Sequence, residues 1–230
     1  MTGAQAIRRF PKTGWRNRLA RWMLSVKRRP AATSYLNYQT QTMLKLPFDG
    51  EWYVYWGGRA TAQNYHAASR DQRFAYDFLI LQNGRSHSGT GDRIADYFCF
   101  AQPVYAPGNG VVVSVAIAEP DRVPGDMTLD NPLGNYVILD HGCGEFSFLA
   151  HLRQGSVVVR QGDCVTGGQL IGECGNSGHS SEPHLHYHLQ TTATAFHGEG
   201  LPARFRSYIA NGKWITQGEP VAGQKVRNQS

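Results

Sequence analysis

Three histidines occupy alternate positions in one short segment of the sequence, as His184, His186 and His188. In a β-strand, alternate side chains project from the same face, roughly 6.5 Å apart. A metal ion on that face can take one imidazole as a ligand, while a neighbouring imidazole reaches a water or substrate oxygen beside it. The spacing therefore indicates a metal site, and the alternative is a His-rich strand that faces solvent.

Two residues further upstream are candidate ligands, because zinc commonly combines His nitrogen with carboxylate oxygen and keeps one position open for water. Asp77 lies inside the apolar run 74–80, where an ionised carboxylate is costly unless it is paired or bound to a metal. His66 precedes Asp77 by eleven residues, close enough to lie on an adjacent strand or turn. The alternatives are a buried, hydrogen-bonded aspartate and a surface histidine.

A further histidine, His151, ends a predicted strand over 146–152. A neutral imidazole at a strand end can orient a water molecule or stabilise a developing oxyanion. We expect His151 to contribute to the same site, and the alternative is a hydrogen bond that ends the strand.

The elements that must position these side chains are strands. From residue 46 to about 195, short runs rich in β-branched and aromatic residues alternate with Gly, Pro, Asn and Asp. This pattern predicts an all-β, mainly antiparallel fold, either a sandwich or a partly closed barrel. A polar loop at 121–132 interrupts the strands, and a long insertion of this kind often borders a cleft.

The chain divides into three parts by composition and pattern. Residues 1–46 form a basic arm, residues 47–195 the β domain, and residues 196–230 a C-terminal extension and tail. Within the extension, Asn211 and Gly212 separate two runs of strand formers, which predicts a hairpin.

The formal net charge of +6 is concentrated in the arm, because residues 1–48 hold ten Lys and Arg and no Asp or Glu. The rest of the chain holds 13 basic against 17 acidic residues, so a nucleic-acid partner is not expected. Apolar and basic residues in 15–26 recur at helical spacing, which predicts a short amphipathic helix and makes it a candidate for peripheral membrane contact. A solvated arm or a helix docked on the body is the alternative. No apolar run approaches the ~20 residues of a membrane span, and no clear signal peptide is visible.

The four cysteines lack the C-x-x-C spacing of a Cys-based zinc site. Disulfide pairing and burial as small apolar side chains are both open for them. They are Cys99, Cys143, Cys164 and Cys174.

Four segments, in this order along the chain, resemble the lysostaphin-type (LytM-like) zinc metallopeptidases. With the upstream ligand region they cover roughly residues 64–190. The resemblance implies a lysostaphin-type β-sandwich or hybrid barrel, with one zinc ion as cofactor and peptidoglycan peptides as substrate. The segments are 103–112, 134–142, 150–152 with 159–163 and 168–172, and 183–186.

The resemblance also implies roles for single residues. His186 and Asp77 correspond to zinc ligands, and His184 and His151 to the two catalytic histidines. The family's usual first ligand is a His four residues before the Asp, where this chain has Arg73. His66 is the expected substitute, by similarity to a variant seen in part of the family.

A second departure concerns His188, which stands where the family usually has an acidic residue. Either a hydrogen-bonding partner of a ligand or a spare ligand fits that position.

Together these observations predict a zinc metallo-endopeptidase that hydrolyses peptide bonds of bacterial peptidoglycan through a metal-activated water. Because ligand imidazoles must be neutral, we expect activity to fall below about pH 6. By resemblance the protein works in the cell envelope, either periplasmic or extracellular. The sequence gives no indication of oligomeric state.

Two other classes of protein fit parts of the same pattern. One is an inactive homologue that binds cell-wall peptide or activates another hydrolase. The other is a lipoyl- or biotinyl-carrier barrel, which needs a Lys at a hairpin tip. No Lys occurs between Lys45 and Lys213, which excludes the carrier.

Overall fold

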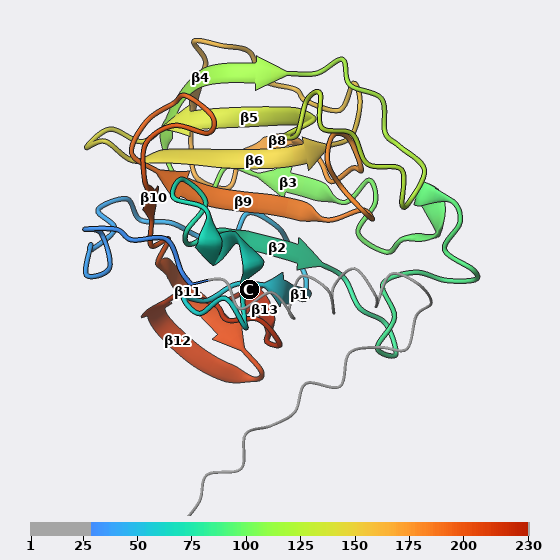
Figure 1. Ribbon diagram of the computed structural model, residues 1–230, viewed down its shortest axis with the longest axis horizontal. Helices are drawn as coiled ribbons and strands as arrows, with labels where there is room; N and C mark the ends of the chain where they lie inside the picture. Colours follow the sequence, from blue (N-terminus) through green and yellow to red (C-terminus); the bar gives the residue numbers. More distant parts are fainter. Residues whose placement is uncertain (1–28, 230) are drawn as a thin grey trace, which may run out of the picture.

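The computed structural model describes residues 29–229, and within this range it contains strands, two short 3₁₀ helices and no α-helix (Figure 1). The all-β prediction is confirmed, since every pair of named strands is antiparallel. The predicted helix over 15–26 lies outside the described residues. No helix of residues 29–229 has the length and apolar character needed to cross a membrane.

The elements follow one another along the chain with connections of varied length, the longest between β4 and β5. In order they are β1 (Trp52–Trp56), η1 (Tyr65–Ala68), β2 (Tyr76–Leu79), η2 (Ile94–Asp96), β3 (Pro103–Tyr105), β4 (Gly110–Ala116), β5 (Asn135–Asp140), β6 (Phe146–Leu152), β7 (Cys164–Val165), β8 (Leu170–Glu173), β9 (Leu185–Gln190), β10 (Gly200–Leu201), β11 (Phe205–Ala210), β12 (Lys213–Gly218) and β13 (Lys225–Asn228).

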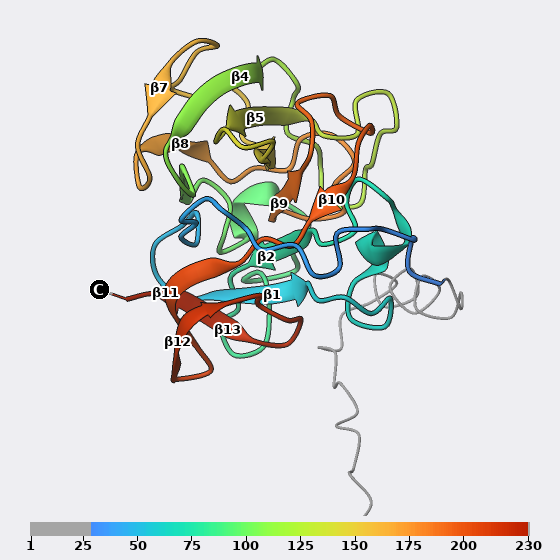
Figure 2. The same cartoon turned by 90° about the vertical axis from the view of Figure 1, so that its left-hand side faces the viewer.

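Most strands belong to one large sheet, in the order β12-β11-β13-β1-β2-β9-β6-β5-β4-β7, with β10 pairing to β9. The strands β3 and β8 form a separate pair. The C-terminal strands β11 to β13 continue the large sheet and lie at the end opposite β4 and β7 (Figure 2). Asn211 (φ 48°) and Gly212 (φ 78°) connect β11 to β12, and positive φ at both positions is what a type I′ hairpin turn requires.

One hydrophobic core holds the two sheets together. Every second residue of β9 enters it, including Leu185 and Tyr187, both without exposed surface. Val104 of β3 and Ile171 of β8 belong to the same cluster, so the small sheet covers this face of the large one. Because successive strand residues point to opposite faces, the polar residues between the core positions must gather on the other face.

The segment that precedes β1 is built into the body. Leu44 and Leu46 are buried in the core, and the fully buried Glu145 carboxylate accepts hydrogen bonds from the backbone N–H groups of Gln41 and Thr42 at 2.6 and 2.8 Å. The Tyr38 hydroxyl donates to the same carboxylate at 2.9 Å. This part of the predicted arm is therefore anchored.

The four cysteines are free thiols in two settings. Cys99 and Cys174 are buried in the core, and Cys143 and Cys164 are exposed. Burial as a small apolar side chain therefore describes the first two.

Candidate metal centre

The centre of the site is set by strand register. β2 and β9 pair so that Asp77 lies opposite His186, and both side chains point away from the core face that Tyr76 and Leu185 occupy. His186 Nδ1 lies 2.9 Å from Asp77 Oδ1. Both residues are buried, with 3% and 5% of their surface exposed. Asp77, which lies in an apolar strand, is therefore in contact with an imidazole from the neighbouring strand.

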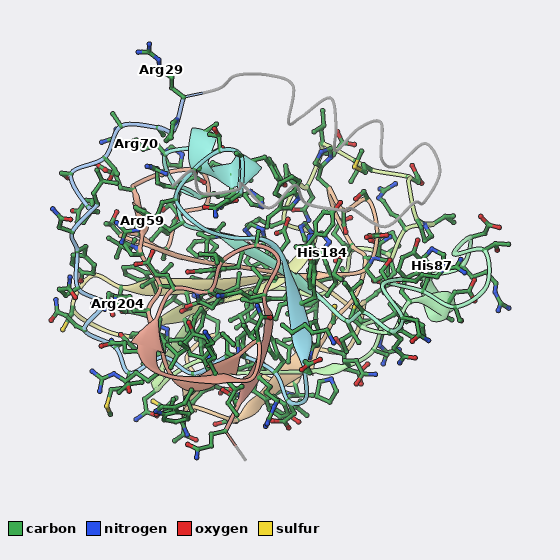
Figure 3. All side chains as sticks on the ribbon, turned by 90° about the horizontal axis from the view of Figure 1, so that it is seen from below. Arg29, Arg59, Arg70, His87, His184 and Arg204 are labelled. Atoms are coloured by element: carbon green, nitrogen blue, oxygen red, sulfur yellow. The ribbon has the colours of Figure 1, made fainter. Side chains whose placement is uncertain are left out.

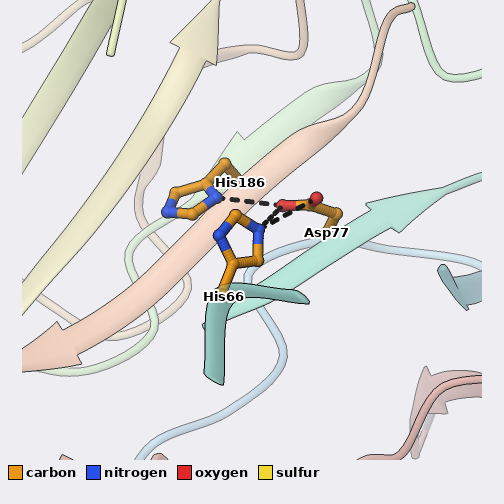
Figure 4. A group of neighbouring side chains, drawn as sticks. All are labelled: His66, Asp77 and His186. Carbon is orange, nitrogen blue, oxygen red and sulfur yellow. Dashed lines mark hydrogen bonds and ion pairs between the residues drawn. The ribbon is translucent and has the colours of Figure 1, made fainter. Parts of the chain in front are cut away.

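The third member comes from the 3₁₀ helix η1, not from a strand. Asn64 caps this helix by accepting a hydrogen bond from His66 N, and its Nδ2 donates to the carbonyl of Ala75, just before β2, at 2.9 Å. These bonds fix η1 against the start of β2. His66 Nε2 consequently lies 3.1 Å from each oxygen of Asp77 (Figure 4).

The donor set fits a zinc ion. One atom each of His66, Asp77 and His186 lie within 4.8 Å of one another, and all three residues are buried. Ligand atoms on a tetrahedral zinc lie about 3.3 Å apart, given Zn–N and Zn–O distances near 2.0–2.1 Å. His66 Nδ1 is 3.0 Å from Gln72 Oε1, and an amide oxygen only accepts, so His66 carries its proton on Nδ1 and turns a bare Nε2 towards Asp77.

Burial and the contacts among these residues together set their pKa values. Burial alone raises the pKa of the Asp77 carboxyl, but the neighbouring histidines His66, His184 and His186 outweigh this effect, so the pKa lies well below its usual range. Burial lowers the pKa of His186 to about 4. The carboxylate is therefore ionised and the His186 imidazole neutral near pH 7, which are the forms that bind a metal.

His151 approaches the centre from β6 in an unusual backbone conformation. Its φ is 61°, a left-handed geometry that costs a non-glycine residue about 1–3 kcal/mol. The backbone N–H of His151 donates to the Leu133 carbonyl, and its ring Nδ1 lies 2.9 Å from the Ser177 carbonyl. Since a carbonyl only accepts, Nδ1 carries the proton and Nε2 is the free acceptor. Burial lowers the pKa of His151 well below its usual range.

His184 completes the site at the start of β9. Its Nδ1 lies 2.8 Å from the Glu182 carbonyl, so this ring also carries its proton on Nδ1. Its Nε2 lies 3.7 Å from Asp77 Oδ1, and the ring centroids of His151 and His184 are 4.7 Å apart. His184 is half-buried, and Figure 3 shows it near the middle of that view, with His87 towards the right-hand side.

The structure also places the two departures noted in the sequence. Arg73 is buried, and its Nη1 donates to the Arg59 carbonyl at 2.9 Å. Its guanidinium lies over the Phe74 ring, and it is not part of the metal group formed by His66, Asp77 and His186. His188 lies behind His186, with its Nδ1 2.9 Å from His186 Nε2. His188 therefore contacts the side of His186 that faces away from Asp77.

Sequence reasoning missed the residues that hold these rings in place. His66 contacts Asn64 and Gln72, and His151 contacts Ser177. Gln190 contacts His188, which in turn contacts His186. A signal existed for Asn64, because Asn just before a short helical segment is a preferred N-cap. Gln190 also had a sequence signal, because it continues the alternation that begins at His184.

Comparison with known proteins identifies the region around the site. Residues 93–197 match the model of peptidase family M23, a stretch that includes His151, His184 and His186. His66 and Asp77 lie before it. The family resemblance read from the sequence is thereby confirmed for the region that carries His151 and His184.

The chain is also similar to curated proteins and to solved structures. The chain is 39% identical over 89 residues to the peptidoglycan DD-endopeptidase ShyA of Vibrio cholerae, covering 36% of this chain and 20% of that protein. It is 30% identical over 104 residues to an uncharacterised metalloprotease of Buchnera aphidicola, covering 43% of this chain and 27% of that protein. The chain thus spans about a quarter or less of these relatives. Among solved structures, the catalytic domain of lysostaphin from Staphylococcus simulans is 21% identical over 67% of this chain and 89% of its own, with a TM-score of 0.40. Pseudoalterin, an M23 metalloprotease from the deep sea, is 17% identical over 81% and 98%, with a TM-score of 0.47.

Proposed function

We propose that this chain, which carries a region of peptidase family M23 over residues 93–197, is a zinc-dependent endopeptidase that hydrolyses peptide bonds of bacterial peptidoglycan. One observation supports the proposal above the others. Three potential ligand atoms, His66 Nε2, Asp77 Oδ1 and His186 Nδ1, converge beside two further imidazoles. Acceptors at this spacing repel one another unless a proton or a metal cation lies between them.

The proposed ligands are His66, Asp77 and His186, which together hold one zinc ion and contribute a single negative charge. A zinc ion in such a site supplies Lewis-acid polarisation of a carbonyl and lowers the pKa of water towards neutrality. Burial of all three ligands excludes competing water and strengthens their electrostatic interactions.

His151 and His184 are the proposed catalytic residues. Both rings donate from Nδ1 to a backbone carbonyl, so each has a bare Nε2 that can take a proton from an attacking water. Once protonated, the same Nε2–H can donate to the oxyanion of the tetrahedral intermediate or to the leaving amine. The carbonyls of Ser177 and Glu182 hold both tautomers throughout, and burial keeps the resting His151 ring neutral by lowering its pKa.

The substrate class and the place of action rest on the relatives. One relative is named a peptidoglycan DD-endopeptidase, and for the fold we propose the lysostaphin-type sandwich or hybrid barrel that the sequence resemblance implies. On that basis we infer a cell-envelope location, with residues 15–26 proposed as a peripheral membrane contact. The division of the chain at residues 46 and 195 remains part of the same proposal.

The test combines metal analysis with digestion of purified sacculi. The purified protein should contain about one zinc per chain and release soluble peptides from sacculi. His186→Ala and His151→Ala should both abolish release, but only His186→Ala should remove the zinc. His87→Ala, distant from the site, serves as the control and should digest normally.

A metal-free homologue that only binds cell-wall peptide would behave differently. It would contain no stoichiometric zinc, digest nothing, and keep its affinity for sacculi after His186→Ala. That set of results would overturn the proposal.

A further inference from the structure

A buried chain of polar side chains extends from His186 away from the metal group. It consists of His186, His188 and Gln190, alternate residues of β9 that share one face. Their exposed fractions are 3%, 2% and 0%. Hydrogen bonds link Gln190 to His188 and His188 to His186, and His186 contacts Asp77. These buried polar side chains therefore act on the proposed metal ligands through the His186 ring.

The direction of every proton in this chain follows from its far end. Gln190 Nε2 donates to the backbone carbonyls of Thr192 and Thr194 at 2.7 and 3.0 Å. Because carbonyls only accept, this assignment of the amide is fixed, and Gln190 Oε1 is left to accept. His188 Nε2 lies 3.2 Å from that oxygen and so must carry a proton.

The same logic continues to the ligand. A neutral His188 with its proton on Nε2 has a bare Nδ1, which lies 2.9 Å from His186 Nε2. His186 must therefore carry its proton on Nε2, and its Nδ1 is bare. This is the atom that faces Asp77 Oδ1 at 2.9 Å.

The contact with Asp77 shows why such a device is needed. A carboxylate beside an imidazole nitrogen favours a proton on that nitrogen, since the N–H···O⁻ hydrogen bond is charge-assisted. Without a competing acceptor, His186 would move its proton to Nδ1, donate to Asp77 and lose the lone pair that a metal needs. His188 offers the opposite nitrogen an acceptor in a buried position.

We propose that His188 and Gln190 are positioning residues that hold His186 in the Nε2–H tautomer and thereby keep its Nδ1 free for the metal. This inference rests on the proposed zinc site, but it concerns His188 and Gln190, which are not among the proposed metal ligands. It also assigns His188 as the hydrogen-bonding partner of the proposed ligand His186, and not as a spare ligand. Its ring stacks on Phe148, with centroids 4.4 Å apart and planes 17° from parallel, which fixes its orientation.

The test uses two substitutions that differ in a single property. His188→Leu keeps apolar bulk against Phe148 but accepts no hydrogen bond. His188→Asn places an amide oxygen near the position of the former Nδ1 and restores an acceptor for His186 Nε2–H. His87→Leu, at a buried histidine that is not part of the metal group, controls for the loss of any histidine.

Two measurements are made on each protein. The first is the ¹⁵N spectrum of the histidine rings in the metal-free protein, which distinguishes Nδ1–H from Nε2–H. The second is zinc affinity by competition with a chelator. Loss of a hydrogen-bonding partner behind a metal ligand typically weakens metal binding by about 10- to 100-fold.

The expected result is Nε2–H at His186 in the wild type and in His188→Asn, with zinc affinities within about threefold of each other. His188→Leu should show Nδ1–H at His186 and bind zinc about 10- to 100-fold more weakly, while His87→Leu matches the wild type. An Nδ1–H tautomer in the wild type, or His188→Leu with unchanged tautomer and affinity, would overturn the inference. If the wild type binds no zinc, the proposed function fails, but the tautomer measurements still decide the role of His188.

Discussion

Gly134 lies where the loop that carries Ser177 passes closest to the start of β5. Its φ is +62°, and a Cβ built on it would lie 2.5 Å from both the carbonyl oxygen and the Oγ of Ser177. Both atoms are in use, because the carbonyl accepts from His151 Nδ1 and the Oγ accepts from Asn135 N at 2.9 Å. Gly134→Ala must therefore displace the residue that orients a proposed catalytic histidine.

The structure provides a matched comparison for the size of the effect. Gly142 has a φ of +79°, and a Cβ added there would have no neighbour within 4 Å, so Gly142→Ala carries the backbone cost alone, about 1–2 kcal/mol. Gly134→Ala carries a similar backbone cost plus steric overlap in a packed site, about 1–3 kcal/mol. At roughly 2–4 °C per kcal/mol for a chain of this size, Gly134→Ala should melt about 2–12 °C below Gly142→Ala.

Activity should separate the two variants more sharply than stability. A displacement near 1 Å at a catalytic group can cost on the order of 100-fold in rate, so Gly134→Ala should digest sacculi about 100-fold more slowly. Gly142→Ala should digest at the wild-type rate, and both should retain zinc because neither contacts a proposed ligand. The reasoning is refuted if the two variants melt together, or if Gly134→Ala melts lower but digests normally.

Three further predictions concern metal, pH and a buried carboxylate. Zinc at about 100 times its Kd should stabilise the wild type by about 2.7 kcal/mol, seen as a higher melting temperature that chelation reverses, and Asp77→Ala should show no zinc-dependent shift. The metal-free protein should lose stability as the pH falls from about 6.5 towards 4, because burial lowers the pKa of His186 to about 4 and that of His151 well below its usual range, so the unfolded chain binds these protons first. The loss of unfolding free energy should approach about 1.4 kcal/mol per pH unit for each such proton. Urea titrations at pH 7 and pH 5 measure it, and a free energy of unfolding that rises on acidification would contradict the prediction. Glu145→Gln turns an amide N–H₂ towards the N–H of Gln41 or Thr42, so urea unfolding should show a loss of about 1–3 kcal/mol with zinc affinity unchanged. Equal stability would show that these contacts contribute little.

The parts of the site that follow from local periodicity could be predicted from the sequence. Strand alternation places His184, His186 and His188 on one face, because it depends only on the period of two along a strand. The continuous apolar run around Asp77 predicts that this residue is buried. The antiparallel β fold follows from the same period and from the turn residues between the runs.

The remaining parts depend on contacts between distant segments. His66 was expected on a strand or turn near Asp77, and it lies on a 3₁₀ helix whose place is set by the bond from Asn64 to the Ala75 carbonyl. The left-handed backbone of His151 has no local signal, since it is held by the Leu133 and Ser177 carbonyls. The buried Arg73 also has no local signal, because its guanidinium finds an acceptor in the distant Arg59 carbonyl.

The proton positions around His66, Asp77 and His186 give the aspartate inside an apolar strand a role. The available N–H of His66 is directed to Gln72 and that of His186 to His188, so neither ring has a donor left for Asp77. The carboxylate then faces two bare nitrogens at 2.9 and 3.1 Å, an arrangement that a cation stabilises. Surrounding hydrogen bonds on η1 and β9 hold the three acceptors together before any cation binds. Preorganisation of this kind reduces the ordering cost of binding, and it makes metal affinity sensitive to residues such as His188 that never contact the ion.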